Sequence, residues 1–208
     1  MTILALDTTS DLGSVAVRKD GRTLAELALH SREGSAHLIF PAIEETLRQA
    51  QVSLAGIDCF AAASGPGSFT GVRIGLSVVK GLAEAAGKPV AGISNLRALS
   101  WFGHGALRAA VIDARRGDVY TAVYDVALRL ISAEVVLPRA AWLREAAEHP
   151  EYEVVSQQGT QESAPRDLAA AIAYCAELDG PAGWQNALTL DANYVRRSDP
   201  QLFWTDVG

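Results

Sequence analysis

Short segments in which apolar residues dominate, or alternate with polar ones, fill the first 30 positions of the chain. Residues 2–7 (TILALD) form an apolar, β-prone run that is typical of a buried strand. Turn-forming residues follow, then an apolar segment that begins at Ser14, a second turn, and the alternating segment 22–30. This pattern predicts a β-meander of three strands.

After Ser35 the apolar residues recur every three or four positions, which predicts a helix over residues 35–50. Ser35 suits the N-cap, and Pro41 predicts either a kink or an irregular first turn. A strand at 57–63, a Gly-rich loop, a helix at about 72–86, a strand at 89–94 and a short helix at 95–103 are expected next. The apolar face of the first helix comprises Leu38, Ile39, Ala42, Ile43, Thr46, Leu47 and Ala50.

The same order of elements begins again near residue 109. The segments LALDTTSDLGSVAV and AVIDARRGDVYTAV each contain an apolar strand ending in Asp (Asp7, Asp113), a polar turn with Gly (Gly13, Gly117) and a second apolar strand. Strands at 130–136 and 152–157 and helices at 138–147 and 165–178 are expected to complete the second half. We therefore expect an α/β protein with two lobes, residues 1–104 and 105–208, joined at 102–107.

Composition narrows the classes of function. The 208 residues are 49% hydrophobic and carry a formal net charge of -6. This negative charge argues against nucleic-acid binding by charge alone, but it permits a role in an RNA-modifying complex that contains a basic partner. The two cysteines, Cys59 and Cys175, have no metal-like spacing and favour a reduced, cytoplasmic compartment. We expect no signal peptide and no membrane-spanning segment.

The most distinctive segment is SGPGSFTGVRIGLSVVKGLA, residues 64–83. Gly65 and Gly67 permit a tight strand-to-helix turn, and Ser68 and Thr70 can cap the helix that follows. A Gly-rich loop at a helix N-terminus can also hold a phosphate. The spacing excludes a Walker loop and a dinucleotide fingerprint, so a phosphate cradle and a purely structural turn remain, with the turn favoured.

Two glycines lie on one face of the following helix. Gly71 and Gly75 are four residues apart, and each costs about 0.5–1 kcal/mol relative to Ala in a helix interior. Close approach of another element would account for that cost. The element can belong to this chain or to a partner.

These motifs carry a resemblance to a known family. A βββαβαβα lobe that occurs twice, with an acidic residue in each first hairpin, resembles the actin, Hsp70 and sugar-kinase (ASKHA) superfamily. The segments ALDTTSDLGSVAV, GPGSFTGVRIGLSVVKGLA, VIDARRGDVY and YVRR resemble the TsaB (YeaZ) family along the whole chain. The resemblance implies two actin-like (ribonuclease H-like) lobes, the second reduced.

The resemblance also implies a function. Proteins of this family assist formation of N6-threonylcarbamoyladenosine at position 37 of tRNAs that read ANN codons. The chain would be a non-catalytic subunit that binds and activates a TsaD-type catalytic paralogue, alongside a TsaE-type ATPase, and would form a homodimer when alone. It would need no cofactor itself. ATP or ADP and Mg²⁺ would act at the level of the complex, which would also bind the tRNA.

The site residues follow from the same resemblance. The helix at 35–50 and the Gly-rich helix would form an intersubunit bundle, although their apolar faces could equally be core. Two turns of the first lobe would contact a nucleotide or phosphate. One is the hydroxyl-bearing turn that begins at Asp7, and the other is the Gly-rich loop that begins at Gly65. The interface set is Leu38, Ile39, Ala42, Gly71, Gly75, Val78, Val79 and Leu82, and the phosphate set is Asp7, Thr8, Thr9, Gly65, Gly67 and Ser68.

Several features oppose catalysis. Both hairpin loops lack the small residues that wrap a phosphate, so Asp7 and Asp113 are favoured as turn caps over magnesium ligands. Arg115 and Arg116, in the second hairpin, fit either a solvated turn or a contact with an anion or partner, with the turn favoured. Where the catalytic paralogue has an HxxxH metal pair, this chain has Asn95 and Leu99. We expect no catalytic residue and no metal site.

Two other functions remain possible, and the placement of one segment is open. A stand-alone ATP-dependent phosphotransferase is favoured by Asp7 and the two-lobe repeat but opposed by the loop compositions. A peptidase has the least support, because no metal or nucleophile site is visible. The segment 202–204 (LFW) near the C-terminus could pack back on the first lobe.

Overall fold

The first lobe is built on a five-stranded sheet with the order β3-β2-β1-β4-β5. The computed structural model describes residues 1–30, 37–156 and 167–195. Strands β1 (Thr2–Asp7), β2 (Leu12–Lys19) and β3 (Arg22–His30) form the expected antiparallel meander. Strands β4 (Cys59–Gly65) and β5 (Val90–Ser94) extend it in parallel to β1.

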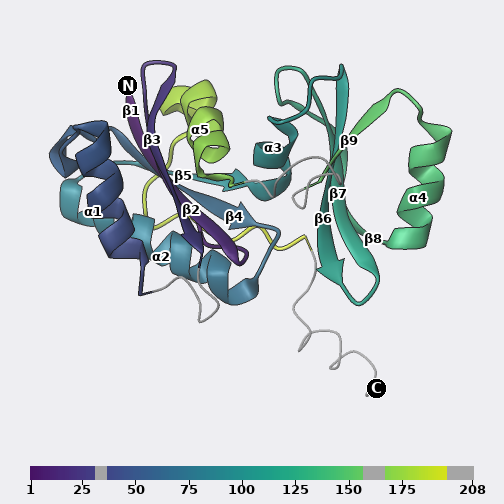
Figure 1. Cartoon of the computed structure of the whole chain (residues 1–208), viewed down its shortest axis with the longest axis horizontal. Coiled ribbons are helices and arrows are strands. Elements are labelled where there is room, and N and C mark those ends of the chain that lie inside the picture. The colour runs from purple at the N-terminus through teal and green to yellow at the C-terminus, as the bar shows by residue number, and fades with distance from the viewer. Residues whose placement is uncertain (31–36, 157–166, 196–208) are drawn as a thin grey trace.

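Helices cover both faces of this sheet (Figure 1). Helices α1 (Ile39–Ala50) and α2 (Phe69–Ala86) pack on the side chains of Leu4 and Leu6, whereas α3 (Asn95–Ser100) and α5 (Ala169–Gly183) pack on the side of Ile3 and Ala5. A short 3-10 helix, η1 (Leu54–Gly56), precedes β4. Burial on both faces explains why β1 is apolar throughout rather than alternating.

The second lobe has a four-stranded sheet with the order β8-β7-β6-β9. Its strands are β6 (Leu107–Arg115), β7 (Asp118–Asp125), β8 (Leu130–Pro138) and β9 (Tyr152–Ser156). Helix α4 (Arg139–Glu148) covers one face through the buried Trp142, and the other face joins the core around α3 and α5. This is the two-lobed α/β fold that the strand and helix pattern predicts.

The last described part of the chain returns to the first lobe. The amide of Ala169 donates to Ser14 Oγ (3.0 Å), and Arg18 forms an ion pair with Glu177 (2.5 Å). Farther on, Gln185 bridges to Val90, and Leu190 is buried beside α2. The first lobe therefore contains both the beginning and the end of the described chain.

The starts of helices α1 and α2 differ from the sequence prediction. Helix α1 begins at Ile39, and Ser35 lies outside the described residues. Pro41 falls in its first turn, where the backbone N–H groups lack helical partners in any case, so the helix tolerates it. Helix α2 begins at Phe69 because the side chain of Ser68 accepts from the amide of Gly71 (3.3 Å), as its predicted capping role requires. None of the described helices is long and apolar enough to cross a membrane.

The glycines of α2 account for its position. A Cβ on Gly71 would lie 2.0 Å from the carbonyl oxygen of Thr8, and one on Gly75 would lie 2.6 Å from Thr8 Oγ1. Thr8 Oγ1 in turn donates to the carbonyl of Gly71 (2.7 Å). The element that approaches these two glycines is thus the turn after β1, within the same chain.

Replacing Gly71 should therefore damage the fold. We expect Gly71→Ala to lower the free energy of unfolding by about 3 kcal/mol or more, because the obstructing atom belongs to the backbone. The matched control is Gly81→Ala on the same helix, where a Cβ meets nothing within 4 Å. It should raise the free energy of unfolding by about 0.5–1 kcal/mol. Urea unfolding of the isolated variants measures both, and equal effects would contradict the packing described.

Candidate functional site

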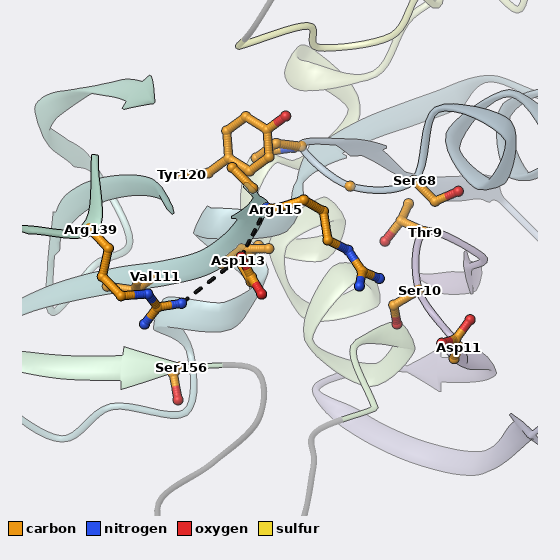
Figure 2. A pocket seen from close by; sticks show the side chains of 14 residues that line it. Thr9, Ser10, Asp11, Ser68, Val111, Asp113, Arg115, Tyr120, Arg139 and Ser156 are labelled. Carbon is orange, nitrogen blue, oxygen red and sulfur yellow. Dashed lines mark hydrogen bonds and ion pairs between the residues drawn. The ribbon is translucent and has the colours of Figure 1, made fainter. Parts of the chain in front are cut away.

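A pocket of about 540 Å³ lies between the lobes, where their first hairpins face each other (Figure 2). The first lobe contributes the β1–β2 turn and the Gly-rich loop, and the second contributes the β6–β7 hairpin with the start of α4. The lining residues are Thr9, Ser10, Asp11, Pro66, Gly67, Ser68, Val111, Ile112, Asp113, Ala114, Arg115, Tyr120, Arg139 and Ser156.

Asp7 acts as a turn cap behind this pocket. Its side chain is fully buried, and its Oδ1 accepts from the amide of Thr9 (2.9 Å) and from Thr9 Oγ1 (2.6 Å). Its Oδ2 has no hydrogen-bond partner among the described residues. Burial raises the pKa of Asp7 above its ordinary value, although the bonds from Thr9 act in the opposite direction.

The predicted phosphate residues divide into two groups. Thr9, Gly67 and Ser68 line the pocket, whereas Asp7, Thr8 and Gly65 do not. Thr8 is held under α2, and the carbonyl oxygen of Asn193 covers Gly65, 2.8 Å from where a Cβ would lie. The β1–β2 turn thus contributes Thr9, Ser10 and Asp11 to the pocket lining, whereas the carboxylate of Asp7 stays buried behind it.

Asn95 connects the two turns of the first lobe. It is buried, its Oδ1 accepts from the amide of Gly65 (2.9 Å), and its Nδ2 donates to Thr9 Oγ1 (2.6 Å). Leu99, one helical turn later, is fully buried in the core. No group of three potential metal ligands occurs within the described ranges. The local pattern around Asn95 indicates only that it replaces a metal ligand, because its structural role depends on contacts with the distant residues Gly65 and Thr9.

A second polar cluster joins the lobes at Glu134. Its carboxylate accepts from Tyr124 Oη (2.6 Å), Asn193 Nδ2 (2.6 Å) and Ser94 Oγ. Burial, reinforced by Glu134, raises the pKa of Tyr124, so its phenol remains a hydrogen-bond donor. Sequence reasoning had no signal for this cluster because its members come from separate strands and from the C-terminal segment.

Arg115 extends into the pocket from the second lobe (Figure 2). Its backbone has φ +67°, and its amide donates to Asp113 Oδ1 (2.9 Å). The favoured prediction of a turn cap thus holds for Asp113, whose Oδ1 also lies 3.9 Å from Arg139. Arg115 is exposed at this turn, in agreement with the favoured prediction, and its side chain also lines the pocket.

The predicted interface residues mostly face inward. Buried within the first lobe are Ile39, Ala42, Gly71, Gly75 and Val79, and half-buried against the same core are Leu38, Val78 and Leu82. The exposed part of α2, which we call the α2 outer face, is centred on Ser77, Gly81 and Ala85 and is bordered by the half-buried side chains of Ile74, Val78 and Leu82. The sequence identified the helix, but most of the chosen positions are covered by the chain itself, because amphipathic spacing marks an apolar face without saying what covers it.

Two mixed sheets, each opening with a hairpin and facing the other across a pocket, define a two-lobed α/β protein of the actin-like class. The family model described as "TsaD: tRNA N6-adenosine threonylcarbamoyltransferase" matches residues 29–176. A solved structure, YeaZ from Pseudomonas aeruginosa, is 30% identical with a TM-score of 0.74 and covers 93% of this chain and 99% of that one. The chain belongs to the TsaB (YeaZ) family.

Curated relatives agree with this assignment over part of their length. The tRNA threonylcarbamoyladenosine biosynthesis protein TsaB of Escherichia coli is 42% identical over 129 residues, which are 60% of this chain and 55% of that protein. The Bacillus subtilis protein of the same name is 33% identical over 127 residues, 60% of this chain and 56% of that protein. The matched segment thus spans about half the length of these relatives.

The buried carboxyl of Asp7 should make stability depend on pH. Because its pKa is raised in the folded state, that state holds the proton more tightly than the unfolded chain does. Wild-type stability should therefore fall relative to Asp7→Asn as pH rises from the ordinary carboxyl value of 3.8 to the raised value. Urea unfolding of both proteins across this range measures the difference, and a difference that does not change with pH would contradict a raised pKa.

Removing the amide of Asn95 should leave buried groups without partners. We expect Asn95→Ala to lower the free energy of unfolding by about 2–4 kcal/mol, because the amide of Gly65 and the hydroxyl of Thr9 each lose a partner. Asn186→Ala, which removes an exposed side-chain bond to the amide of Leu188, should cost only about 0.5 kcal/mol. Thermal or urea unfolding compares them, and similar losses would show that the buried network is unimportant.

Proposed function

We propose that this chain is a non-catalytic subunit in the formation of N6-threonylcarbamoyladenosine at position 37 of tRNAs that read ANN codons. It docks on a larger TsaD-type catalytic paralogue and activates it. The names of the curated relatives support this pathway. The observation that carries the docking role is the α2 outer face.

Gly81 lies at the centre of this face, and no contact with the described residues explains why this position is a glycine. In contrast to Gly71 and Gly75, a Cβ at Gly81 would meet no atom within 4 Å. Gly in a helix interior costs about 0.5–1 kcal/mol relative to Ala, so close approach of a partner helix would account for it. Ser77 and Ala85, one turn away on either side, are also small and exposed.

Apolar side chains border these small residues. Ile74, Val78 and Leu82 are spaced four apart along α2 and are only half-buried in the isolated chain. Apolar side chains that remain partly exposed beside small residues are typical of a protein–protein contact. The small residues let a second helix lie close, and the larger ones would then become fully buried.

The interior of the first lobe supports a non-catalytic role. Asp7 is engaged as a turn cap, and Asn95 bonds to both turns. Leu99 fills the core where the resemblance places a metal ligand in the catalytic paralogue. In this proposal ATP or ADP and Mg²⁺ belong to the assembled complex in the cytoplasm, a TsaE-type ATPase joins it, and the chain pairs with itself through the same face when the paralogue is missing.

A charged, bulky residue at Gly81 should prevent docking without unfolding the chain. We expect Gly81→Arg to weaken the complex with the native paralogue at least about tenfold, because it places a desolvated charge and excess volume in the contact. Titration calorimetry or a quantitative pull-down measures this. Gly75→Leu is unsuitable for the purpose, because it would collide with Thr8 inside the chain.

The control is Ala147→Arg, which adds the same side chain at an exposed position of α4. It should leave the affinity unchanged. Failure of the wild-type chain to bind its paralogue would refute the proposed function, and equal affinities of Gly81→Arg and the wild type would refute the proposed face.

A further inference from the structure

The β6–β7 hairpin directs Arg115 into the pocket by a local irregularity. Asp113 pairs with Val119 and Arg115 pairs with Asp118, so the β6 strand has one extra residue at this point. Arg115 has φ +67°, a left-handed conformation that Gly adopts more readily than Arg. Bulges of this kind redirect side chains near binding sites. Here the effect is to aim a guanidinium group across the pocket rather than along the sheet.

Among the described residues, no group forms a hydrogen bond or ion pair with the side chain of Arg115. Figure 2 shows its guanidinium group opposite Thr9 and Ser10, with Asp11 beyond Ser10 in that view. Asp113 is already bonded to the amide of Arg115 and faces Arg139. The pocket therefore contains a guanidinium group that no described residue engages, and such a group is suited to binding a phosphate.

Two exposed aromatic rings lie near the N-terminal end of α2, next to the pocket. Phe69 directly follows Ser68 of the pocket, and its ring centroid is 5.8 Å from that of Tyr194. These side chains are 45% and 48% exposed, respectively. The guanidinium carbon of Arg73 lies 3.7 Å from the centroid of Phe69, and its Nε donates to Tyr194 Oη (3.3 Å). Two more arginines, Arg196 and Arg197, follow in the sequence.

The size of the pocket and its surroundings favour a polymer over a bare ion. A volume of about 540 Å³ is far more than inorganic phosphate occupies, and it lies within the range of organic-ligand sites. Single-stranded nucleic acids are held by cationic groups on the backbone and by aromatic or guanidinium surfaces against the bases. The pocket and the neighbouring cluster of Phe69, Arg73 and Tyr194 provide both kinds of contact.

We propose that this chain contacts single-stranded RNA directly, with Arg115 and Arg139 holding a backbone phosphate in the pocket and Phe69 and Tyr194 stacking on a neighbouring base. The proposal rests on the proposed function, since it assigns to this subunit part of the tRNA binding of the complex. It requires no overall positive charge, because Arg115 and Arg139 both line the pocket itself.

The test uses the full chain in complex with its native paralogue and an unmodified transcript of a tRNA that reads an ANN codon. We expect Arg115→Ala to weaken tRNA binding about 5- to 20-fold and to reduce the slope of log affinity against log salt by about 1. Phe69→Ala should weaken binding about 5- to 50-fold with little change in slope. The control Arg144→Ala removes an equal charge from an exposed position on α4 and should have no effect.

Assembly with the paralogue is measured first for each variant, and the same tRNA titrations are made on the isolated chain. If no complex forms but the isolated chain binds tRNA in a manner dependent on Arg115, the docking proposal fails and the RNA contact stands. Wild-type tRNA affinity for both Arg115→Ala and Phe69→Ala overturns the RNA contact. The proposed RNA contact is also overturned if Arg115→Ala abolishes binding of AMP but leaves the tRNA affinity unchanged. The phosphate that Arg115 binds would then belong to a free nucleotide and not to the RNA backbone.

Discussion

The packing of α2 against the turn that follows β1 sets the positions of the main functional features. The carbonyl of Thr8 occupies the space that a side chain at residue 71 would need, and the hydroxyl of Thr8 bonds back to the carbonyl of Gly71. The amide of Ser68 donates to the carbonyl of Thr9 (2.8 Å), which fixes the start of α2 to the same turn. With one side of the helix held this closely, its opposite side, with Gly81, is presented to solvent.

Buried polar bonds complete the arrangement around that contact. Asn95 links the Gly-rich loop to Thr9, and Thr9 bonds to Asp7, so both turns of the first lobe are held by one network. Because an unpaired buried polar group is costly, such a network specifies one geometry for its members. Glu134 performs the same task between lobes, since it accepts from Ser94 and Asn193 of the first lobe and from Tyr124 of the second. The pocket lies between two hairpins that are thus held at a defined separation.

Much of the fold could be predicted from the sequence because its signals are local. The meander follows from apolar runs and turns, and the start of α2 follows from the capping chemistry of Ser68. What could not be predicted depends on contacts between distant segments. Periodicity shows that Gly71 shares a face with Gly75, but it cannot show that Thr8 covers that face while Gly81 remains open. Nor can it show that α5 packs on the first sheet, or that Asn95 reaches Thr9. For the candidate site, Thr9, Gly67 and Ser68 were found from motifs, whereas the pocket position of Arg115 depends on a bulge that composition does not reveal.

The proposed function requires that this chain act through a docking surface on α2 rather than through a catalytic centre. Amide hydrogen exchange of the isolated chain and of its complex with the TsaD-type paralogue tests this claim most directly. We expect the amides of α2 from Ile74 to Ala86 to become more protected in the complex, while those of α4 and β8 keep the exchange rates of the free chain. Unchanged exchange along α2, with protection appearing at α4 or β8 instead, would contradict it.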